Sequence, residues 1–513
     1  MKVFSDKLNK SELNLKSDFK SKYFYVLALS ACFFIVSSCP SFSWQDSGMI
    51  QYRVFQNDIE GGLGLALSHP LFYIIAIAAK YIPFGAFAFK VNMISAFAAA
   101  VTVANLFLFL RIWLKDGFAA IVGAVTLAVS HTFWGHGSIA ETYTLYTAFL
   151  SAELVMLAFY FNERKIKYLY WLVVFNGLSV SVHMLGSIAL ACYAFFFLVL
   201  LVKKQLKFQH LVLMIVLWII AAGPYEYLIV KNIVLTGDIK AVLMSAAFGD
   251  SWAKDVLNTT ITPTIIKQNI MFFGLNFPTP NILFFFAGIF LVNKMACCRS
   301  FKNILFGLLL LFLIFASRYT IVDRYAFFIP FYVMVSVFIA AGVKMVADKI
   351  KGKALLTLIF VCCFIPVPVY AVLPEIAKAV DLKIGTKRVL PYRDDYKFFL
   401  QPWQTGYRGA ERFANEALDQ VEKDAIIFAD GTTVYPLLLT QKITGKRKDV
   451  TILSNHGRID SLKKMDKNTI GEKILAASAY VVSPIEGYCP GFILENYDFV
   501  EAGVLFRVLE RVE

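Results

Sequence analysis

Long runs of apolar residues alternate with short polar segments along most of the chain. Runs suited to crossing roughly 30 Å of hydrocarbon occur at residues 23–39, 87–110, 117–134, 141–161, 168–184, 187–202, 209–230, 281–294, 303–317, 326–346 and 354–373. An apolar run of this kind favours a helix, because a helix satisfies its own backbone polar groups inside lipid. The pattern therefore predicts a bundle of about eleven membrane-spanning helices within residues 23–373.

Two longer segments, 40–86 and 226–281, interrupt this alternation. In the first, a polar stretch leads into an apolar segment at 63–83 that is broken at His69-Pro70. Proline disfavours a continuous helix, so we expect an interfacial or re-entrant helix here and not a span. The second segment has amphipathic stretches between glycine and proline residues and is expected to cover a cavity.

From residue 374 onward, charged residues are spread evenly and no apolar run is long enough to span a membrane. Alternating and buried-type patterns predict strands at 425–429, 450–453, 479–483 and 499–509, with a helix at 434–444. We therefore expect a soluble α/β domain at 374–513. The whole chain is predicted to be mainly α, a polytopic helix bundle that carries this small extramembrane domain.

Composition and charge agree with this organisation. The chain is 58% hydrophobic and only 17% charged, which excludes an ordinary soluble protein. The net charge of +14 comes from Lys and Arg in short loops at 111–115, 164–167, 203–207, 294–302 and 344–353. These loops fall on one side of the membrane if residues 1–22 are cytoplasmic, as the positive-inside rule requires. This distribution argues against a nucleic-acid partner and places the C-terminal domain in the periplasm or a lumen.

The sequence has no recognisable motif for a metal site or a phosphate-binding loop. None of its eight cysteines forms a Cys-x-x-Cys pair or a Cys/His pair with metal-ligand spacing, and there is no Gly-rich phosphate loop. Lys-rich loops and free thiols are compatible with a bacterial inner membrane. We predict no metal triad.

Unusual polar residues gather on the predicted outer side. Ionisable groups near spans are costly in lipid and tend to line a cavity, so their convergence favours a site. Asp46 is a candidate general base, although an Asp before Gly also forms turns. The candidate substrate-binding residues are His69, His131, Glu141, Tyr143, His183, Arg318 and Arg324. Each also has a simpler interpretation as a buried, interfacial or ion-paired residue.

Several motifs at these residues resemble the DUF2723 membrane family, which includes the vertebrate O-mannosyltransferases that act on plexin-type domains. The motifs, in chain order, are Asp46-Ser47-Gly48, His69-Pro70, Ser130-His131-Thr132-Phe133-Trp134, Ala140-Glu141-Thr142-Tyr143-Thr144-Leu145, Gly177-Leu178-Ser179 with His183, Asp323-Arg324-Tyr325 with Pro330, and Ile427-Phe428-Ala429-Asp430-Gly431. The resemblance covers most of the chain. The sequence departs from the family at Met49, where the family usually has Glu, and at residues 71–73.

The resemblance implies a GT-C architecture and a glycosyltransferase that uses a polyprenyl-phosphate sugar. On this model Asp46 accepts the proton of a Ser or Thr hydroxyl as a hexose, expected to be mannose, is transferred with inversion. Arg324 steadies the lipid phosphate, and His69, Glu141 and His183 position the sugar or phosphate. The expected partners are the lipid-linked sugar, a protein or glycan acceptor and the membrane. No cofactor is required, although a divalent metal is compatible with the site.

Two other functions stay open at this point. A transporter or lipid flippase would also bury His, Arg and Glu in a bundle, although no inverted repeat is visible. The change at Met49 leaves open a catalytically inactive protein that binds a lipid-linked sugar.

Overall fold

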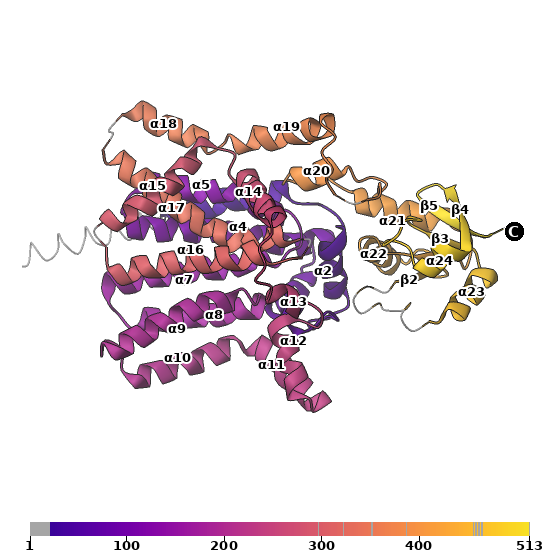
Figure 1. Ribbon diagram of the computed structural model, residues 1–513, viewed down its shortest axis with the longest axis horizontal. Helices are drawn as coiled ribbons and strands as arrows, with labels where there is room; N and C mark the ends of the chain where they lie inside the picture. Colours follow the sequence, from indigo (N-terminus) through magenta and orange to yellow (C-terminus); the bar gives the residue numbers. More distant parts are fainter. Residues whose placement is uncertain are drawn as a thin grey trace, which may run out of the picture.

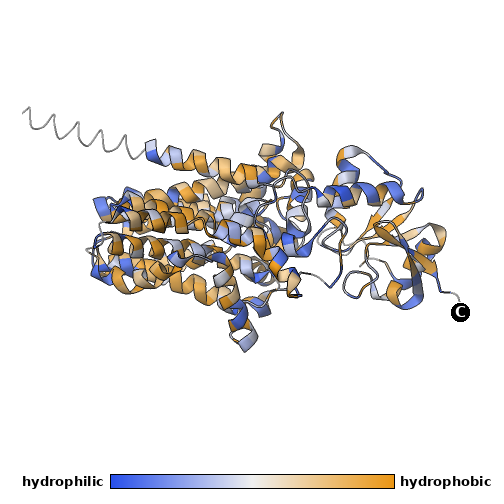
Figure 2. Cartoon of the chain, turned by 90° about the horizontal axis from the view of Figure 1, so that it is seen from above, coloured by the Kyte–Doolittle hydropathy of each residue, from blue (hydrophilic) through white to orange (hydrophobic). Residues whose placement is uncertain are grey.

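The computed structural model describes residues 21–295, 297–321, 323–349, 352–385, 387–454, 456, 459, 462 and 465–511. The predicted cytoplasmic segment 1–22 therefore lies outside the described residues, except for its last two positions. The described chain forms a helix bundle along the long axis and a smaller domain with a sheet beyond one end of that bundle (Figure 1). The bundle is largely apolar, whereas the smaller domain mixes apolar and polar residues (Figure 2).

Five helices in the described chain are long and apolar enough to cross a membrane. They are α4 (Phe87–Leu114), α7 (Tyr143–Glu163), α16 (Arg299–Arg318), the continuous η4 and α17 (Arg324–Ala347), and the pair α18 and α19 (Lys353–Ala379). Shorter helices α8 (Lys167–Val182) and α9 (Gly186–Val202) run beside them, and an apolar helix at Ser21–Ser37 begins the described chain.

Three further pairs of helices are bent. They are α5 (Gly117–Ala128) with α6 (His131–Gly137) at 69°, α10 (Phe208–Ala221) with α11 (Gly223–Thr236) at 74°, and α14 (Pro263–Asn276) with Pro280–Lys294 at 117°. The last segment comprises η2, α15 (Leu283–Leu291) and η3. Counting each bent pair as one span gives up to eight spans among the described residues. Every one of the predicted runs falls on a helix, but the count of about eleven spans stays a prediction.

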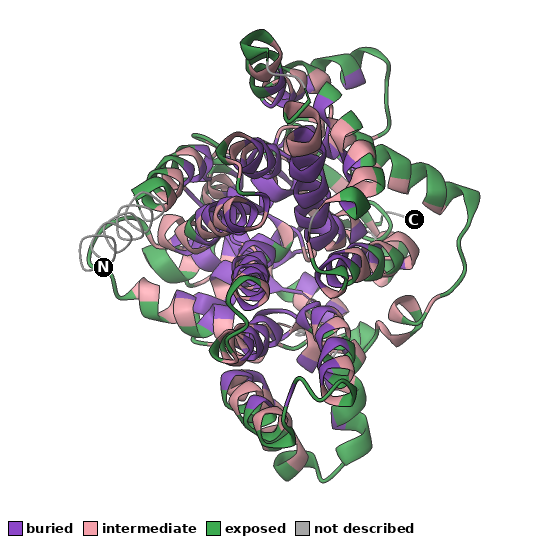
Figure 3. Cartoon of the chain, turned by 90° about the vertical axis from the view of Figure 1, so that its left-hand side faces the viewer, coloured by how far each residue is buried: buried purple, intermediate pink, exposed green. Residues whose placement is uncertain are grey.

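Helix α17 forms the centre of the bundle. All of its residues from Ile329 to Val343 are buried, and the exposed faces of the surrounding helices point outward (Figure 3). Gly342 of α17 lies against Gly288 of α15. A Cβ atom added to either glycine would overlap a backbone carbonyl of the other helix. Small residues at such positions let two helices approach closely without lipid between them.

The first outer segment forms α2 (Gln45–Phe55), η1 (Leu65–Leu67) and α3 (Pro70–Lys80). Helix α3 begins directly after His69, whose left-handed backbone (φ 52°) stops a helix from continuing through it. At about 1.5 Å per residue, 11 residues are too short to cross a bilayer. The segment is thus broken where the His-Pro pair predicts.

The C-terminal domain is an α/β unit with one five-stranded sheet in the order β2-β1-β3-β5-β4. Strand β1 (Ile426–Phe428) pairs in parallel with β2 (Thr451–Leu453) and β3 (Ala479–Val481), while β5 pairs antiparallel with β3 and β4. Helices α20 (Asp395–Leu400), α21 (Gly409–Gln420), α22 (Val434–Thr444), α23 (Lys467–Ala476) and α24 (Gly491–Asn496) complete it.

Most of the predicted strands and the helix at 434–444 are found, with two differences. The segment predicted as a strand at 499–509 is the end of a hairpin, in which β4 (Tyr497–Ala502) turns at Gly503 (φ 59°) into β5 (Leu505–Glu510). The helical part also ends later than residue 373, because α19 continues through Pro374 to Ala379. Proline lacks a backbone donor, but this position did not prevent helix formation.

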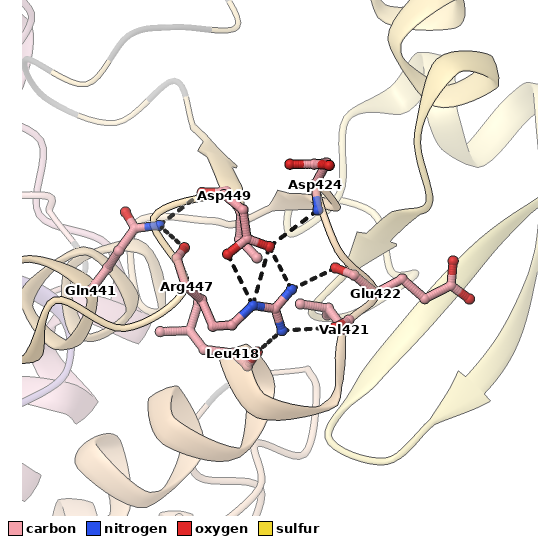
Figure 4. Close-up of polar contacts among 8 residues, drawn as sticks. Leu418, Val421, Glu422, Asp424, Gln441, Arg447 and Asp449 are labelled. Carbon is pink, nitrogen blue, oxygen red and sulfur yellow. Dashed lines mark hydrogen bonds and ion pairs between the residues drawn. The ribbon is translucent and has the colours of Figure 1, made fainter.

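Arg447 connects the segments that precede the parallel strands β1 and β2. Its guanidinium donates to the carbonyl oxygens of Leu418, Val421 and Glu422 at 2.7, 2.8 and 2.7 Å, and it contacts Asp449 at 2.8 Å (Figure 4). The hydrogen bonds from this guanidinium lower the pKa of Asp449. One side chain thus joins the end of α21 to the approach to β2.

Helix α2 belongs to two hydrophobic cores. Its Ile50 and Val54 are buried in the core of the bundle, while Met49 and Tyr52 pack against the core of the C-terminal domain. Just before α2, the Trp44 indole donates a 2.7 Å hydrogen bond to the Tyr407 hydroxyl of the C-terminal domain. The two domains therefore meet at α2.

Candidate active site

Asp46 lies in the first turn of α2, at the boundary between the bundle and the C-terminal domain. Its side chain is accessible to solvent, although many protein atoms surround it. Burial raises the pKa of its carboxyl group. Among the described residues, no hydrogen bond occupies this carboxylate. The preceding residue, Gln45, has a left-handed backbone (φ 55°) that is uncommon for a residue of this type.

Glu141 comes from the link between α6 and α7 and reaches the same region. Its carboxylate accepts a 3.2 Å hydrogen bond from the Ser47 hydroxyl, next to Asp46. Its backbone is fixed by Ser95 of α4, whose hydroxyl accepts from the Glu141 N–H and donates to the Glu141 carbonyl, both at 2.8 Å. Burial, followed by the negative charges of Asp46 and Asp323, raises the pKa of Glu141 well above its ordinary range.

Asp323 brings a third carboxyl group from the turn before η4. Burial, followed by the charge of Asp46, raises its pKa to about 6. The charge of Asp46 thus contributes to the raised pKa values of both Glu141 and Asp323. We call Asp46, Glu141 and Asp323 the carboxylate cluster. It places three carboxyl groups with raised pKa values next to one another.

A row of rings adjoins the cluster. The centroids of the His69 and His183 rings are 4.9 Å apart, and those of His183 and Tyr143 are also 4.9 Å apart. His69 Nδ1 lies 2.8 Å from the carbonyl oxygen of Val182, which fixes the ring beside the end of α8. Burial lowers the pKa of His69 to about 4, so its imidazole is neutral near pH 7.

The comparisons with known proteins agree with this architecture. Residues 66–208, which include His69, Glu141, Tyr143 and His183, match the family model of the N-terminal domain of the protein O-mannosyl-transferase TMEM260. The fold matches ArnT from Cupriavidus metallidurans bound to undecaprenyl phosphate, with a TM-score of 0.58, 11% identity and coverage of 96% of this chain and 98% of that chain. ArnT in the apo state gives a TM-score of 0.55, again with 11% identity, over 97% and 98% of the two chains. No curated protein sequence matches the chain.

Residues 66–208 are thus similar to the TMEM260 family, and the chain shares the fold of the GT-C protein ArnT. The resemblance seen in the sequence is thereby confirmed, as is the mainly α membrane bundle with a small α/β domain. The apolar helices and the fold shared with ArnT support an integral, multi-pass membrane protein.

Two arginines lie at the end of α16 and at the start of η4, which leads into α17. Arg324 is buried and donates to Gln268 Oε1 at 2.8 Å and to the carbonyls of Ile265 and Tyr319 at 3.2 and 3.4 Å. Arg318 donates to the carbonyls of Val256 and Asn258 at 2.7 and 2.6 Å. These oxygens are all neutral, so neither guanidinium charge is cancelled by a carboxylate in the contacts of the described chain. Both charges remain able to attract an anion.

The structure does not bring His131 to the carboxylate cluster. Its ring packs edge-on against Tyr370 of α19, with centroids 5.2 Å apart, in the same aromatic region as Trp134 and Trp403. His131 begins α6, beyond the bend that separates α6 from α5. His136, one turn later, instead has its ring 5.2 Å from that of Tyr143.

Three neighbours of Asp46 were not among the predicted site residues. In the sequence, Asp323 stands out only through the motif Asp323-Arg324-Tyr325, and its place beside Arg324 was the usable signal. Ser47 is adjacent to Asp46 in the sequence. Tyr435 of α22 lies close enough for the charge of Asp46 to contribute to a raised tyrosine pKa, after the larger effect of burial. No local pattern links Tyr435 to α2.

Met49, where the family usually has Glu, has a structural explanation. Its side chain is partly buried against the core of the C-terminal domain. An apolar residue suits that contact. For metal binding, the described residues contain no group of three or more His, Cys, Asp or Glu side chains placed to hold an ion.

Proposed function

We propose that this protein transfers a hexose, expected to be mannose, from a polyprenyl-phosphate donor to the hydroxyl group of a protein Ser or Thr or of another acceptor. The observation that carries the proposal is the carboxylate cluster, in which the solvent-accessible Asp46 lies beside Glu141 and Asp323. The match to a protein O-mannosyl-transferase family and the fold shared with ArnT support it.

In this mechanism Asp46 acts as the general base. Its carboxylate accepts the proton of the acceptor hydroxyl as that oxygen attacks the anomeric carbon of the sugar. The bond between the anomeric carbon and the phosphate oxygen breaks on the opposite side, and its electron pair leaves with the lipid phosphate. A single displacement of this kind inverts the anomeric configuration.

The other carboxyl groups and the arginines have separate roles in this mechanism. A cluster of three ionised carboxylates would repel an anionic donor, so we expect Glu141, whose pKa lies well above its ordinary range, to act in its protonated, hydrogen-bonding form. Arg324, whose hydrogen bonds go to neutral oxygens, would stabilise the charge that develops on the departing phosphate. Arg318 is a second candidate for that phosphate, and His69, His183 and Tyr143 are candidates for holding the sugar.

The same cluster would suit two other functions less well. A transporter or flippase has no need of a general base next to a soluble domain. A catalytically inactive sugar-lipid-binding protein was suggested by Met49, but that side chain packs in an apolar contact. In our proposal the C-terminal domain lies in the periplasm or a lumen, and the acceptor reaches Asp46 from that side.

The test is transfer by the purified protein in liposomes, with a labelled polyprenyl-phosphate hexose and a peptide containing Ser and Thr. We expect Asp46→Asn to lower transfer by about 100-fold or more, because general-base catalysis typically contributes this much. Asp238→Asn is the matched control. Asp238 caps α12 (Ile239–Phe248) by accepting from the Ala241 N–H at 2.9 Å, a role that asparagine also fills.

Thermal unfolding must be unchanged in both variants for the comparison to hold. Transfer by Asp46→Asn at the wild-type rate would show that Asp46 is not the base. Movement of the lipid across the bilayer without glycosylation would favour the transporter, and binding without either reaction would favour the inactive protein.

A further inference from the structure

A long apolar groove runs along the outside of the bundle, away from the carboxylate cluster. Its walls come from the helix Ser21–Ser37, α4, α7 and α8, and its volume is about 1950 Å³. The helix Ser21–Ser37 lies at the margin of the bundle (Figure 2). None of the residues of the carboxylate cluster lines this groove. It is therefore a separate feature from the proposed active site.

The groove extends over the full depth of a bilayer. Along α4 it reaches from Lys90 to Arg111, which at about 1.5 Å per residue corresponds to roughly 30 Å, the thickness of the hydrocarbon core. Its lining includes the small side chains Ala98, Ala148 and Ala152. Small residues leave space beside a helix that a flexible hydrocarbon chain can fill.

Charge is distributed unevenly between the two ends of the groove. The end at the C-terminus of α4 carries Arg111, Lys115, Lys165 and Lys167, with Glu163 as its one acidic residue. Glu163 is paired with Lys165 at 2.7 Å, which leaves a net positive charge at this end. At the other end, Lys90 donates to the carbonyls of Lys80 and Ile82 at 2.8 and 2.7 Å.

We propose that this groove binds an anionic glycerophospholipid from the leaflet that borders the C-terminus of α4. Its acyl chains lie along the alanine residues, and its phosphate group lies among Lys115, Lys165 and Lys167. A basic cluster at the end of a membrane helix attracts anionic headgroups. A zwitterionic phospholipid is attracted less, because its own ammonium group opposes the lysines. The lipid is a structural partner and takes no part in sugar transfer.

The test uses the full-length, delipidated protein and compares phosphatidylglycerol with phosphatidylcholine. Native mass spectrometry measures lipid binding, and thermal unfolding measures stabilisation. We expect the wild-type protein to bind phosphatidylglycerol at least about ten-fold more tightly. Lys115→Gln/Lys167→Gln should lose most of that preference. The matched control is Lys203→Gln/Lys204→Gln, two exposed lysines of another basic loop that do not line the groove.

A second variant tests the apolar part. Ala152→Trp fills the groove and should weaken the binding of both lipids, while transfer activity and unfolding without added lipid stay at the wild-type level. Equal binding of the two lipids by the wild-type protein would overturn the proposal. So would an equal loss in the control variant, or a dimer that Ala152→Trp abolishes while lipid binding is retained. All of these outcomes are independent of whether Asp46 is the catalytic base.

Discussion

The Ser47 hydroxyl donates a 3.2 Å hydrogen bond to the Glu141 carboxylate, although 94 positions separate the two residues. This bond joins α2, which carries Asp46, to the link before α7. It therefore fixes the position of Asp46 relative to the bundle.

Removal of this bond should impair catalysis more than folding. We expect Ser47→Ala to lower the turnover number by about 5- to 10-fold, because a single hydrogen bond contributes about 1 kcal/mol. The matched control is Ser38→Ala, since the Ser38 hydroxyl donates to the Phe34 carbonyl of the helix Ser21–Ser37 that precedes it. The turnover numbers of the two variants are compared in the liposome assay. An equal decrease in both would mean that Ser47 has no special role.

Arg324 should act on the lipid-linked donor. We expect Arg324→Gln to raise the KM for the donor by about 10- to 100-fold, because a hydrogen bond to a charged group contributes about 1.5–3 kcal/mol. Arg324→Lys should recover part of this loss, since lysine keeps the charge but not the planar geometry. Steady-state kinetics with varied donor measure the effect. An unchanged donor KM in the glutamine variant would remove Arg324 from the phosphate site.

Asp323 should make stability depend on pH. Its folded-state pKa of about 6 exceeds the value of about 3.9 for a free aspartate, so the folded protein holds this proton more tightly than the unfolded chain does. Its stabilising contribution is present at low pH and is lost as the pH rises through about 6. Asp323→Asn cannot ionise, and we expect it to unfold at a higher temperature than wild type at about pH 7.5.

This gain should shrink towards about pH 5, where the wild-type carboxyl group is mostly protonated. Thermal unfolding in detergent across this pH range measures it. A gain that is constant with pH would contradict the raised pKa.

Gly48 should tolerate no side chain. A Cβ atom at this position would lie 2.5 Å from the Ser43 carbonyl oxygen and 3.3 Å from Tyr435 Cβ. We expect Gly48→Ala to destabilise the protein by about 1–3 kcal/mol, the usual cost of overpacking, and to reduce transfer by displacing α2. Gly274→Ala in α14 is the control, because a Cβ atom there meets nothing within 4 Å. Thermal unfolding of the two variants distinguishes them.

The positions of the membrane helices were predictable because lipid imposes a strong pattern. A long apolar run must satisfy its backbone internally, and each run indeed coincides with a helix. The bends were not predictable from that pattern. The break between Ala128 and His131 lies within one continuous apolar run, so hydropathy alone gives no sign of the 69° change in direction.

The candidate site was predictable only in part. Asp46, His69, Glu141, Tyr143 and His183 were selected because they stand at the ends of helices on one predicted side, and the structure gathers them into one region. His131 has the same sequence context as Glu141, but it faces Tyr370. Tyr435 reaches α2 only through the contact between domains, which depends on the folded arrangement and leaves no trace in the local sequence.

Helix α2 has a consequence for how the protein is made. It leaves the ribosome early, yet Gly48 of this helix lies against Tyr435, and Trp44 just before it bonds to Tyr407, both of which are synthesised much later. A growing chain would hold Asp46 without the later residues that pack around α2. On the proposed function, sugar transfer would thus begin only after the C-terminal domain has folded against this helix.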